Sequence, residues 1–231
     1  MKQLHISSQT RWVICLIGMD GSGKTTHAHR IIAHLQKSGN KCRYVWFGTA
    51  YFLSYPFMIL CRVLGLTKTH YLTNDSAVSE HRYYDNKSVS LIWPWIQFLD
   101  IFIFVNLRVN LPLWGGFNVV CDRFVPDILV ELMTDVNDDK LYKKLVGRLI
   151  LRLMPRSLTV FLLDVDEKIA WLRKNDVPEL RYLTRRRNEY RLISQDLKIP
   201  MVNAEGPFGF VQRYLLAQID GLIGRTSKPQ G

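Results

Sequence analysis

The sequence predicts a single α/β domain, built on a five-stranded parallel sheet with helices on both faces. Short apolar runs alternate along the 231 residues with longer amphipathic segments, and no linker or internal repeat divides them. Continuous apolar runs separated by helices are typical of parallel strands that are buried on both faces. Hydrophobic residues make up 48% of the chain and charged residues 22%, as in an ordinary folded globular protein.

Five apolar runs are the predicted strands, and six longer segments are the predicted helices. In chain order the strands are Trp12–Ile17, Lys41–Phe47, Asn118–Cys121, Leu158–Leu163 and Pro200–Asn203. The helices are Thr25–Gln36, Leu53–Leu64, Ser88–Leu107, Lys140–Leu153, Pro178–Ser194 and Phe208–Leu222. Ligands of such a sheet usually bind beyond the carboxyl ends of the strands, where the functional residues are therefore expected.

The predicted domain covers residues 11–223, between an N-terminal tail (1–10) and a C-terminal tail (224–231). The first ten residues are polar and lack the apolar core of a secretory signal. The four cysteines are scattered without a CxxC pair: Cys15, Cys42, Cys61 and Cys121. We interpret them as small buried apolar residues rather than a disulfide framework or zinc site, and expect a reducing, cytoplasmic location.

One segment, Leu91 to Val105, is apolar enough to raise the question of a membrane. A spanning helix needs about 20 apolar residues, and this segment is shorter and contains Pro94, Gln97 and Asp100. We predict a buried helix of a soluble protein, with association at a membrane surface as the alternative.

The net charge of +11, from 31 Lys and Arg against 20 Asp and Glu, favours anionic partners. Phosphorylated small molecules, nucleic acid and an acidic membrane surface all fit this excess, and composition alone does not choose among them.

Residues 18–25 read GMDGSGKT and fit G-x-x-x-x-G-K-[ST] at every fixed position, between a predicted strand and a predicted helix. This context predicts the three-layer P-loop NTPase fold. Glycines let main-chain N–H groups curl around phosphate oxygens, Lys24 adds a charge toward the β- and γ-phosphates, and the Thr25 hydroxyl is placed to bind Mg²⁺. The predicted ATP-binding residues are Gly18, Gly21, Ser22, Gly23, Lys24, Thr25 and Thr26. A chance glycine-rich turn is the alternative.

The same stretch resembles thymidylate kinases and related nucleoside monophosphate kinases, in which an aspartate stands two residues after the first glycine of the loop. Asp20 occupies that position. The resemblance implies that this carboxylate contacts the sugar hydroxyl of the acceptor nucleotide. A capping or turn aspartate is the alternative.

The stretch Asp122-Arg123-Phe124 follows an apolar strand and is similar to the D-R-[YF] motif of that family. A carboxylate at the end of this strand lies beside the P-loop and can hold Mg²⁺ or its waters, so Asp122 is a predicted metal ligand together with Thr25. Arg123 offers a planar, permanently charged fork to the acceptor phosphate and is a predicted catalytic and acceptor-binding residue. A salt bridge at the end of the strand is the alternative.

Asp100 falls 22 residues before Asp122, where the family carries an A-D-R motif on a long helix. The resemblance implies that Asp100 binds the acceptor, although the arginine of the motif is replaced by Ile101. A helix carboxylate paired with a neighbouring base is the alternative.

Residues 162–167, LLDVDE, resemble the family's LDVDPE strand and lead toward a lid at about residues 173–191. A lid excludes water during phosphoryl transfer and brings positive charge to the transferring group. Because the P-loop itself lacks an arginine, the lid is expected to supply it, and Arg173 and Arg181 are the predicted catalytic arginines. A solvated basic helix face is the alternative for part of this segment.

The acceptor half, residues 48–110, departs from the family pattern. The F-x-R-E-P turn is absent after Phe47, where the chain reads Gly48-Thr49-Ala50, and a polar loop is predicted further on, before His81 to Lys87. That last cluster mixes cations and aromatic rings, which suits an aromatic phosphorylated ligand, and packing of its tyrosines on the core is the alternative.

These observations predict an ATP- and Mg²⁺-dependent phosphotransferase that acts on a nucleoside monophosphate such as dTMP. The first alternative is a kinase of the same fold with another phosphorylated or lipid-linked acceptor. The second is a nucleotide-dependent module that binds nucleic acid or a membrane surface. A small-molecule acceptor is the expected partner, with peripheral membrane contact and a homodimer kept open; nucleic acid is disfavoured because the chain has no aromatic-basic RNA-binding motif.

Overall fold

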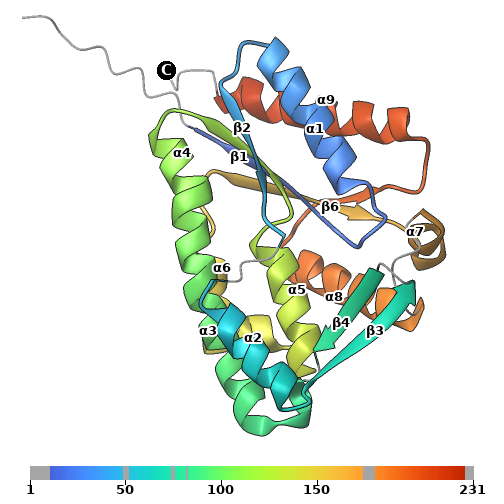
Figure 1. Ribbon diagram of the computed structural model, residues 1–231. Coiled ribbons are helices and arrows are strands. Elements are labelled where there is room, and N and C mark those ends of the chain that lie inside the picture. The colour runs from blue at the N-terminus through green and yellow to red at the C-terminus, as the bar shows by residue number, and fades with distance from the viewer. Residues whose placement is uncertain (1–10, 49–51, 74–75, 82, 174–179, 227–231) are drawn as a thin grey trace, which may run out of the picture.

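The computed structural model is an α/β domain with a five-stranded, all-parallel sheet flanked by helices (Figure 1). It describes residues 11–48, 52–73, 76–81, 83–173 and 180–226, of which 68–81 and 224–226 are described by their backbone alone. The N-terminal tail (1–10), most of the C-terminal tail and residues 174–179 of the expected lid lie outside these ranges. The predicted α/β class and parallel sheet are confirmed.

All five predicted strands form the sheet, each within one residue of its expected bounds. Its order is β2-β5-β1-β6-β7, so two strands lie on each side of β1. The strands are β1 (Val13–Ile17), β2 (Cys42–Trp46), β5 (Asn118–Asp122), β6 (Leu158–Asp164) and β7 (Met201–Asn203). Every residue of β1 and β5 is buried, as expected for continuous apolar runs between two helical layers.

Helices cover both faces of the sheet and form the outer layers of the domain (Figure 1). One layer contains α1 (Lys24–Lys37) and α9 (Phe208–Thr226). The other contains α3 (Lys87–Val105), α5 (Val125–Val136), α6 (Leu145–Arg152) and α8 (Leu180–Asp196). The short helix α7 (Glu167–Arg173) follows β6. The four cysteines are free and buried within the core, as predicted.

The predicted helix Ser88–Leu107 is part of a longer continuous helix. A π-helical turn at Asn106–Asn110 joins α3 to α4 (Leu111–Trp114), so helical structure runs from Lys87 to Trp114. This helix is long and apolar enough to cross a membrane by length and composition alone. Only one face is buried, whereas the opposite face is exposed, so the prediction of a buried helix is wrong for that outer face.

Two regions differ from the sequence-based prediction. Helix α5 was not expected; it buries ten of its twelve residues, including the acidic Asp127 and Asp135. The expected polar loop contains an antiparallel hairpin, β3 (Thr67–Thr73) with β4 (Ser76–His81). β-Branched residues in this segment suit strands that pair outside a core. The predicted helix Lys140–Leu153 divides into a 3₁₀ turn and α6.

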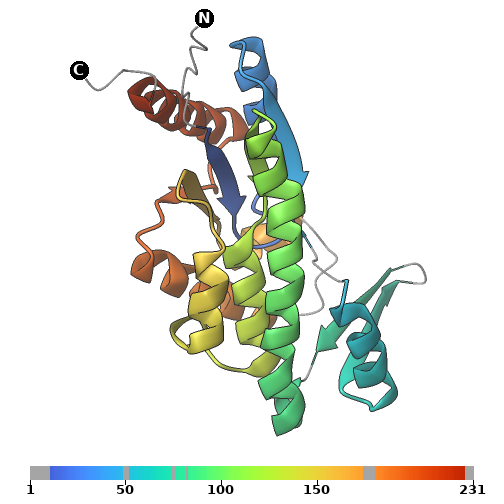
Figure 2. The ribbon, with the colours of Figure 1, turned by 90° about the vertical axis from the view of Figure 1, so that its left-hand side faces the viewer.

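Helix α2 (Ser54–Val63) and the β3–β4 hairpin extend from the domain beside α3, away from the central sheet (Figure 2). Phe57 of α2 stacks on Trp93 of α3, with ring centroids 5.9 Å apart, and Tyr83 packs edge-on against the same indole. Tyr83 is fully buried, in agreement with the alternative that this tyrosine packs on the core.

Candidate functional site

The carboxyl ends of β1, β5 and β6 meet at one edge of the sheet. Leu16 on β1 is opposite Asp122 on β5, so the glycine-rich loop (Gly18–Thr25) and the Asp122–Arg123 pair leave adjacent strands. β6 ends at Asp164 on the other side of β1. Parallel topology therefore brings three of the predicted motifs to the same edge, where parallel α/β sheets bind ligands.

The glycine-rich loop has a backbone path that depends on glycine at three positions. Gly18 has φ 142°, Gly21 has φ 81° and Gly23 has φ 88°, a region that other residues rarely adopt. A Cβ atom at Gly18 would lie 2.6 Å from the Leu163 carbonyl oxygen, and one at Gly21 would lie 2.4 Å from that of Ala170. The loop is thus packed tightly against β6 and α7.

Lys24 begins α1 and is folded across the glycine-rich loop. Its side chain is almost completely buried, with 5% of the residue exposed, and Nζ donates to the carbonyl oxygens of Gly18 (2.6 Å) and Met19 (2.7 Å). Burial lowers the pKa of the Lys24 ammonium from 10.5 to about 8, and the nearby charge of Arg123 adds to the effect. The loop therefore holds a buried cation whose main-chain partners are weak acceptors compared with phosphate.

Thr25 and Asp122 form the second polar contact of this edge. Thr25 Oγ1 donates to Asp122 Oδ2 at 2.6 Å, and the Tyr44 hydroxyl donates to the same oxygen at 3.0 Å. Asp122 is fully buried, yet its Oδ1 has no hydrogen-bond partner in the part of the chain that the structure describes. A buried carboxylate oxygen without a partner, beside a threonine hydroxyl, is a donor set that suits Mg²⁺.

The described residues contain no group of three or more His, Cys, Asp or Glu side chains that could hold a metal by themselves. Mg²⁺ commonly takes only one or two protein ligands and completes its shell with water and substrate phosphates. Thr25 and Asp122 fit that mode of binding, and their role as metal ligands stays a prediction.

Arg123 and Asp20, both predicted to face the acceptor, form an ion pair between the β5–α5 turn and the glycine-rich loop. Arg123 has φ 67°, a left-handed conformation that is costly for a residue with a side chain. Its main-chain N–H donates to the Leu16 carbonyl oxygen at 3.0 Å, which holds the turn in this conformation. The strained backbone thus directs the guanidinium toward the loop.

Asp127 is a residue of this edge that the sequence analysis missed. Its Oδ1 accepts from the Tyr190 hydroxyl (2.8 Å) and the Gly18 N–H (3.4 Å), and its Oδ2 accepts from the Phe124 N–H (2.9 Å). Burial raises the pKa of this carboxyl above its ordinary value. Asp127 therefore connects the glycine-rich loop to α5 and α8. Its position after Pro126 is typical of an acidic residue in the first turn of a helix, and this pattern could have identified it from the sequence.

Arg186 on α8 was also missed as a specific candidate. It is buried, with 8% of the residue exposed, and it donates to the Tyr182 hydroxyl at 3.1 Å. Its guanidinium lies 5.5 Å from the ring centre of Tyr182 and 5.9 Å from that of Tyr190. Among the described residues no ion pair of Arg186 is found; burial opposes its charge, but the neighbouring Tyr182, Tyr190, Glu131 and Asp20 outweigh this and raise its pKa.

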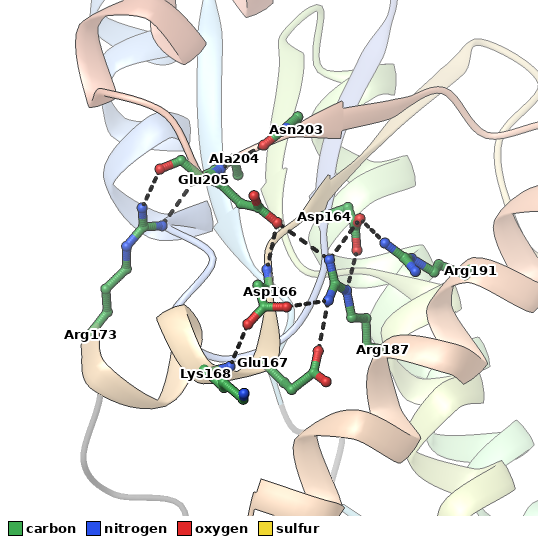
Figure 3. Close-up of polar contacts among 10 residues, drawn as sticks. All are labelled: Asp164, Asp166, Glu167, Lys168, Arg173, Arg187, Arg191, Asn203, Ala204 and Glu205. Atoms are coloured by element: carbon green, nitrogen blue, oxygen red, sulfur yellow. Dashed lines mark hydrogen bonds and ion pairs between the residues drawn. The ribbon is translucent and has the colours of Figure 1, made fainter.

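Two other arginines of α8 are held in an ion-pair network with the acidic residues that follow β6 (Figure 3). Arg187 binds Asp164, Asp166 and Glu167, at 3.1, 3.0 and 2.7 Å, and Arg191 binds Asp164 at 2.7 Å. Burial opposes ionisation of Asp164, but the hydrogen bonds from Arg191 and Arg187 outweigh it and lower the pKa of this carboxyl. These arginines anchor α8 instead of forming a solvated basic face.

The two catalytic arginines predicted from the lid, Arg173 and Arg181, lie in different surroundings. Arg173 donates to the carbonyl oxygens of Ala204 (3.0 Å) and Glu205 (3.2 Å), on the loop after β7 (Figure 3). Arg181 is exposed and lines a cavity of about 670 Å³ between α5 and α8, together with Asn137 and Asp139. No described contact joins either side chain to the glycine-rich loop, so their catalytic role stays a prediction.

Asp100, predicted to bind the acceptor, is fully buried and caps the start of α2. Its carboxylate accepts from the N–H groups of Phe52 (3.0 Å), Leu53 (2.7 Å) and Ser54 (2.9 Å), and from the Ser54 hydroxyl. Unpaired N–H groups at a helix start are stabilised by such an oxygen, here supplied by another helix. A role in acceptor binding stays a prediction.

Searches of protein-family models and of curated proteins found no match to this chain.

Proposed function

We propose that this protein is an ATP-dependent phosphotransferase with a three-layer P-loop NTPase fold, and that its acceptor is a nucleoside monophosphate such as dTMP. The observation that supports this most is the glycine-rich loop itself. Its curled main chain encloses the buried Lys24, and the adjacent Thr25 hydroxyl bonds to Asp122 at the end of the neighbouring strand.

On this proposal, the triphosphate of ATP binds in the glycine-rich loop. The first N–H groups of α1 have no side-chain cap in the described structure, so they and the positive end of the helix dipole are available for an anion. Lys24 Nζ exchanges its two carbonyl partners for phosphate oxygens, which restores the stability of its charged form. Thr25 and Asp122 Oδ1 would hold Mg²⁺, which would supply positive charge to the transferring phosphate.

The acceptor phosphate binds on the side of Arg123, and Asp20 contacts the acceptor sugar. Transfer is in line, with no covalent intermediate on the protein, so catalysis consists of positioning and charge stabilisation. Arg186 is buried without an ion-pair partner among the described residues, and it lies 5.9 Å from the ring centre of Tyr190, whose hydroxyl donates to Asp127 beside the glycine-rich loop. This makes it a better candidate than Arg181 for the arginine that stabilises the transferring group. Arg173 and the main chain at Ala204 and Glu205 border the expected place of the adenine.

A kinase of another phosphorylated or lipid-linked acceptor is the second candidate, and a specific observation favours it. The acceptor half departs from the nucleotide-kinase pattern at Gly48 and Ile101, and α2 and α3 expose large apolar side chains. A nucleic-acid-binding module receives less support, because Arg187 and Arg191 are used in internal ion pairs.

A thermal-shift screen tests the proposal. The full chain is heated with Mg²⁺ and a non-hydrolysable ATP analogue, with and without each nucleoside monophosphate. A true acceptor raises the melting temperature beyond the analogue alone, because it binds the folded state only. ADP formation from Mg-ATP that depends on the same acceptor completes the test. A shift with the analogue but with no nucleoside monophosphate supports the second candidate, and no shift with the analogue overturns ATP binding.

A further inference from the structure

A continuous row of large apolar side chains is exposed along the outer surface of α3 and α4. It contains Leu91, Ile92, Trp95, Leu99, Phe102 and Trp114, of which Leu91 is 71% exposed and Trp114 76%. The spacing of three to four residues keeps the members from Leu91 to Phe102 on one side of the helix. That side is opposite to Trp93 and Asp100, which face the protein.

Helix α2 extends this surface. It packs on α3 through the stacked rings of Phe57 and Trp93, while Tyr55, Ile59, Leu60 and Val63 are exposed. Figure 2 shows α2 beside the long α3–α4 helix, with no other helix or strand in front of either. We call the exposed apolar residues of α2, α3 and α4 the outer apolar face. Monomeric soluble proteins seldom leave so large an apolar surface without a partner.

The charged residues of the outer apolar face are cationic. Arg62 on α2 and Lys87 at the start of α3 are exposed. Arg108 in the π-helical turn is also exposed, but it donates to the Trp46 carbonyl oxygen at 3.3 Å and lies over the Phe104 ring, so it is not part of this face. The sequence of α2 contains no Asp or Glu, and that of Lys87–Trp114 contains Asp100 alone, which is buried in its contacts with α2. The partner must therefore be apolar and anionic, in keeping with the net charge of +11.

A groove between α3 and α6 opens at the edge of this face. It has a volume of about 360 Å³ and combines apolar walls, including Leu91, Trp95 and Leu145, with the ammonium groups of Lys87 and Lys144. Asp138 also lines the groove and pairs with Lys144 at 2.6 Å, so among the described residues Lys87 supplies the uncompensated charge of the rim. Apolar walls beside this cation are suited to an amphipathic molecule with an anionic head.

We propose that the outer apolar face binds the surface of an anionic lipid bilayer, with the Lys87–Trp114 helix lying parallel to the membrane plane. A helix with an apolar face, interfacial tryptophans and flanking cations binds in this way. The proposal does not depend on the proposed function.

Two other arrangements agree less well with the structure. A spanning helix would have to withdraw Asp100 from α2 and Trp93 from Asp135, to which its Nε1 donates at 3.1 Å. Pairing with a second copy through this face about a two-fold axis would set the same cations against each other, with no exposed carboxylate on α2, α3 or α4 to pair with them.

Vesicle sedimentation of the full chain, without nucleotide, tests the proposal. We expect at least about tenfold tighter binding to vesicles of phosphatidylcholine and phosphatidylglycerol than to phosphatidylcholine alone, and weaker binding at high salt, because each cation near an anionic surface contributes about 1 kcal/mol. The double variant Leu91→Glu, Phe102→Glu should lose at least about tenfold in affinity. The matched control is Phe210→Glu on α9, a 64% exposed position across the sheet, which should bind as the wild type does.

Native tryptophan fluorescence provides a second measurement that needs no variant. Brominated lipids in the anionic vesicles should quench the wild-type emission, because Trp95 and Trp114 enter the interface. Failure of the wild-type chain to sediment with anionic vesicles, or the absence of quenching, overturns the proposal. A dimer in light scattering that Leu91→Glu, Phe102→Glu converts to a monomer, without vesicle binding by the wild type, assigns the face to a second copy instead.

Discussion

The sheet edge that carries the glycine-rich loop and the outer apolar face differ in which side chains they bury and which they expose. At this edge, Lys24, Asp122 and Asp127 are buried and most of their polar atoms have partners within the protein. On the outer face, large apolar side chains are in contact with solvent. Burying a polar group costs free energy unless it is hydrogen-bonded, and a large exposed apolar surface is unfavourable unless a partner covers it.

The two regions differ in the kind of partner that their exposed or unpaired groups can bind. At the edge, Lys24 has only carbonyl partners and Asp122 Oδ1 has no hydrogen-bond partner among the described residues. The outer face lacks an entire apolar partner. A small ligand can complete the first region, whereas only an extended surface can complete the second.

The largest effect is expected at the centre of the edge. Lys24→Met should lower kcat at least about 100-fold, because the transferring phosphate loses its buried cation. The free energy of unfolding should not fall, since a buried charge is costly in the nucleotide-free protein. Steady-state kinetics and urea denaturation measure both. Lys37→Met, at the exposed end of α1, is the matched control, and retention of full activity by Lys24→Met would contradict the assigned role.

Variants of two arginines on α8 show which of them belongs to the candidate site. Arg186→Met should lower kcat/KM for the acceptor about 10- to 100-fold, whereas Arg181→Met, in the cavity beside Asp139, should change it less than about threefold. Kinetics with saturating ATP measure the two values. The reverse ranking would return the catalytic role to Arg181.

A variant of Asp100 distinguishes a structural role at the start of α2 from a role in acceptor binding. Asp100→Asn should lower the free energy of unfolding by about 2 kcal/mol, because an amide offers one acceptor where the α2 start presents several donors. Urea denaturation measures this, with the exposed Asp220→Asn as control. Unchanged stability together with a raised KM for the acceptor would favour the acceptor-binding role instead.

The smallest expected effect is a pH dependence of ATP binding. With a pKa of about 8, Lys24 is mostly charged at pH 7 and mostly neutral at pH 9, so the dissociation constant of ATP should rise about tenfold over this range. Isothermal titration calorimetry measures it, and Lys24→Arg should abolish the dependence because a guanidinium stays charged.

In the absence of nucleotide, the free energy of unfolding should increase with pH, whereas the affinity for ATP decreases. The unfolded chain holds the Lys24 proton up to about pH 10.5, whereas the folded protein releases it near 8. The free energy of unfolding therefore gains a contribution as the pH rises from 8 toward 10.5. A constant ATP affinity and a flat stability profile would together contradict the lowered pKa.

The sequence by itself determined the strands and the glycine-rich loop, because both are local. Buried parallel strands are continuous apolar runs, and the spacing of Gly18, Gly23 and Lys24 is set by a backbone path over eight residues. The adjacency of Asp122 and Thr25 also followed, since parallel strands bring their carboxyl ends to one edge. Helix α5 was missed, although Pro126 and Asp127 in its first turn are signals of a helix start.

Only the tertiary structure decided which of several similar residues faces the site. Arg181, Arg186, Arg187 and Arg191 share one helix, but they have three different surroundings: Arg181 lines a cavity, Arg186 packs on tyrosines, and Arg187 and Arg191 both pair with Asp164. It also gave Asp100 four hydrogen bonds from α2 and left one side of the long apolar helix uncovered. The physical reason is that side-chain contacts between elements depend on the angle and distance at which those elements pack, which no local pattern of residues encodes.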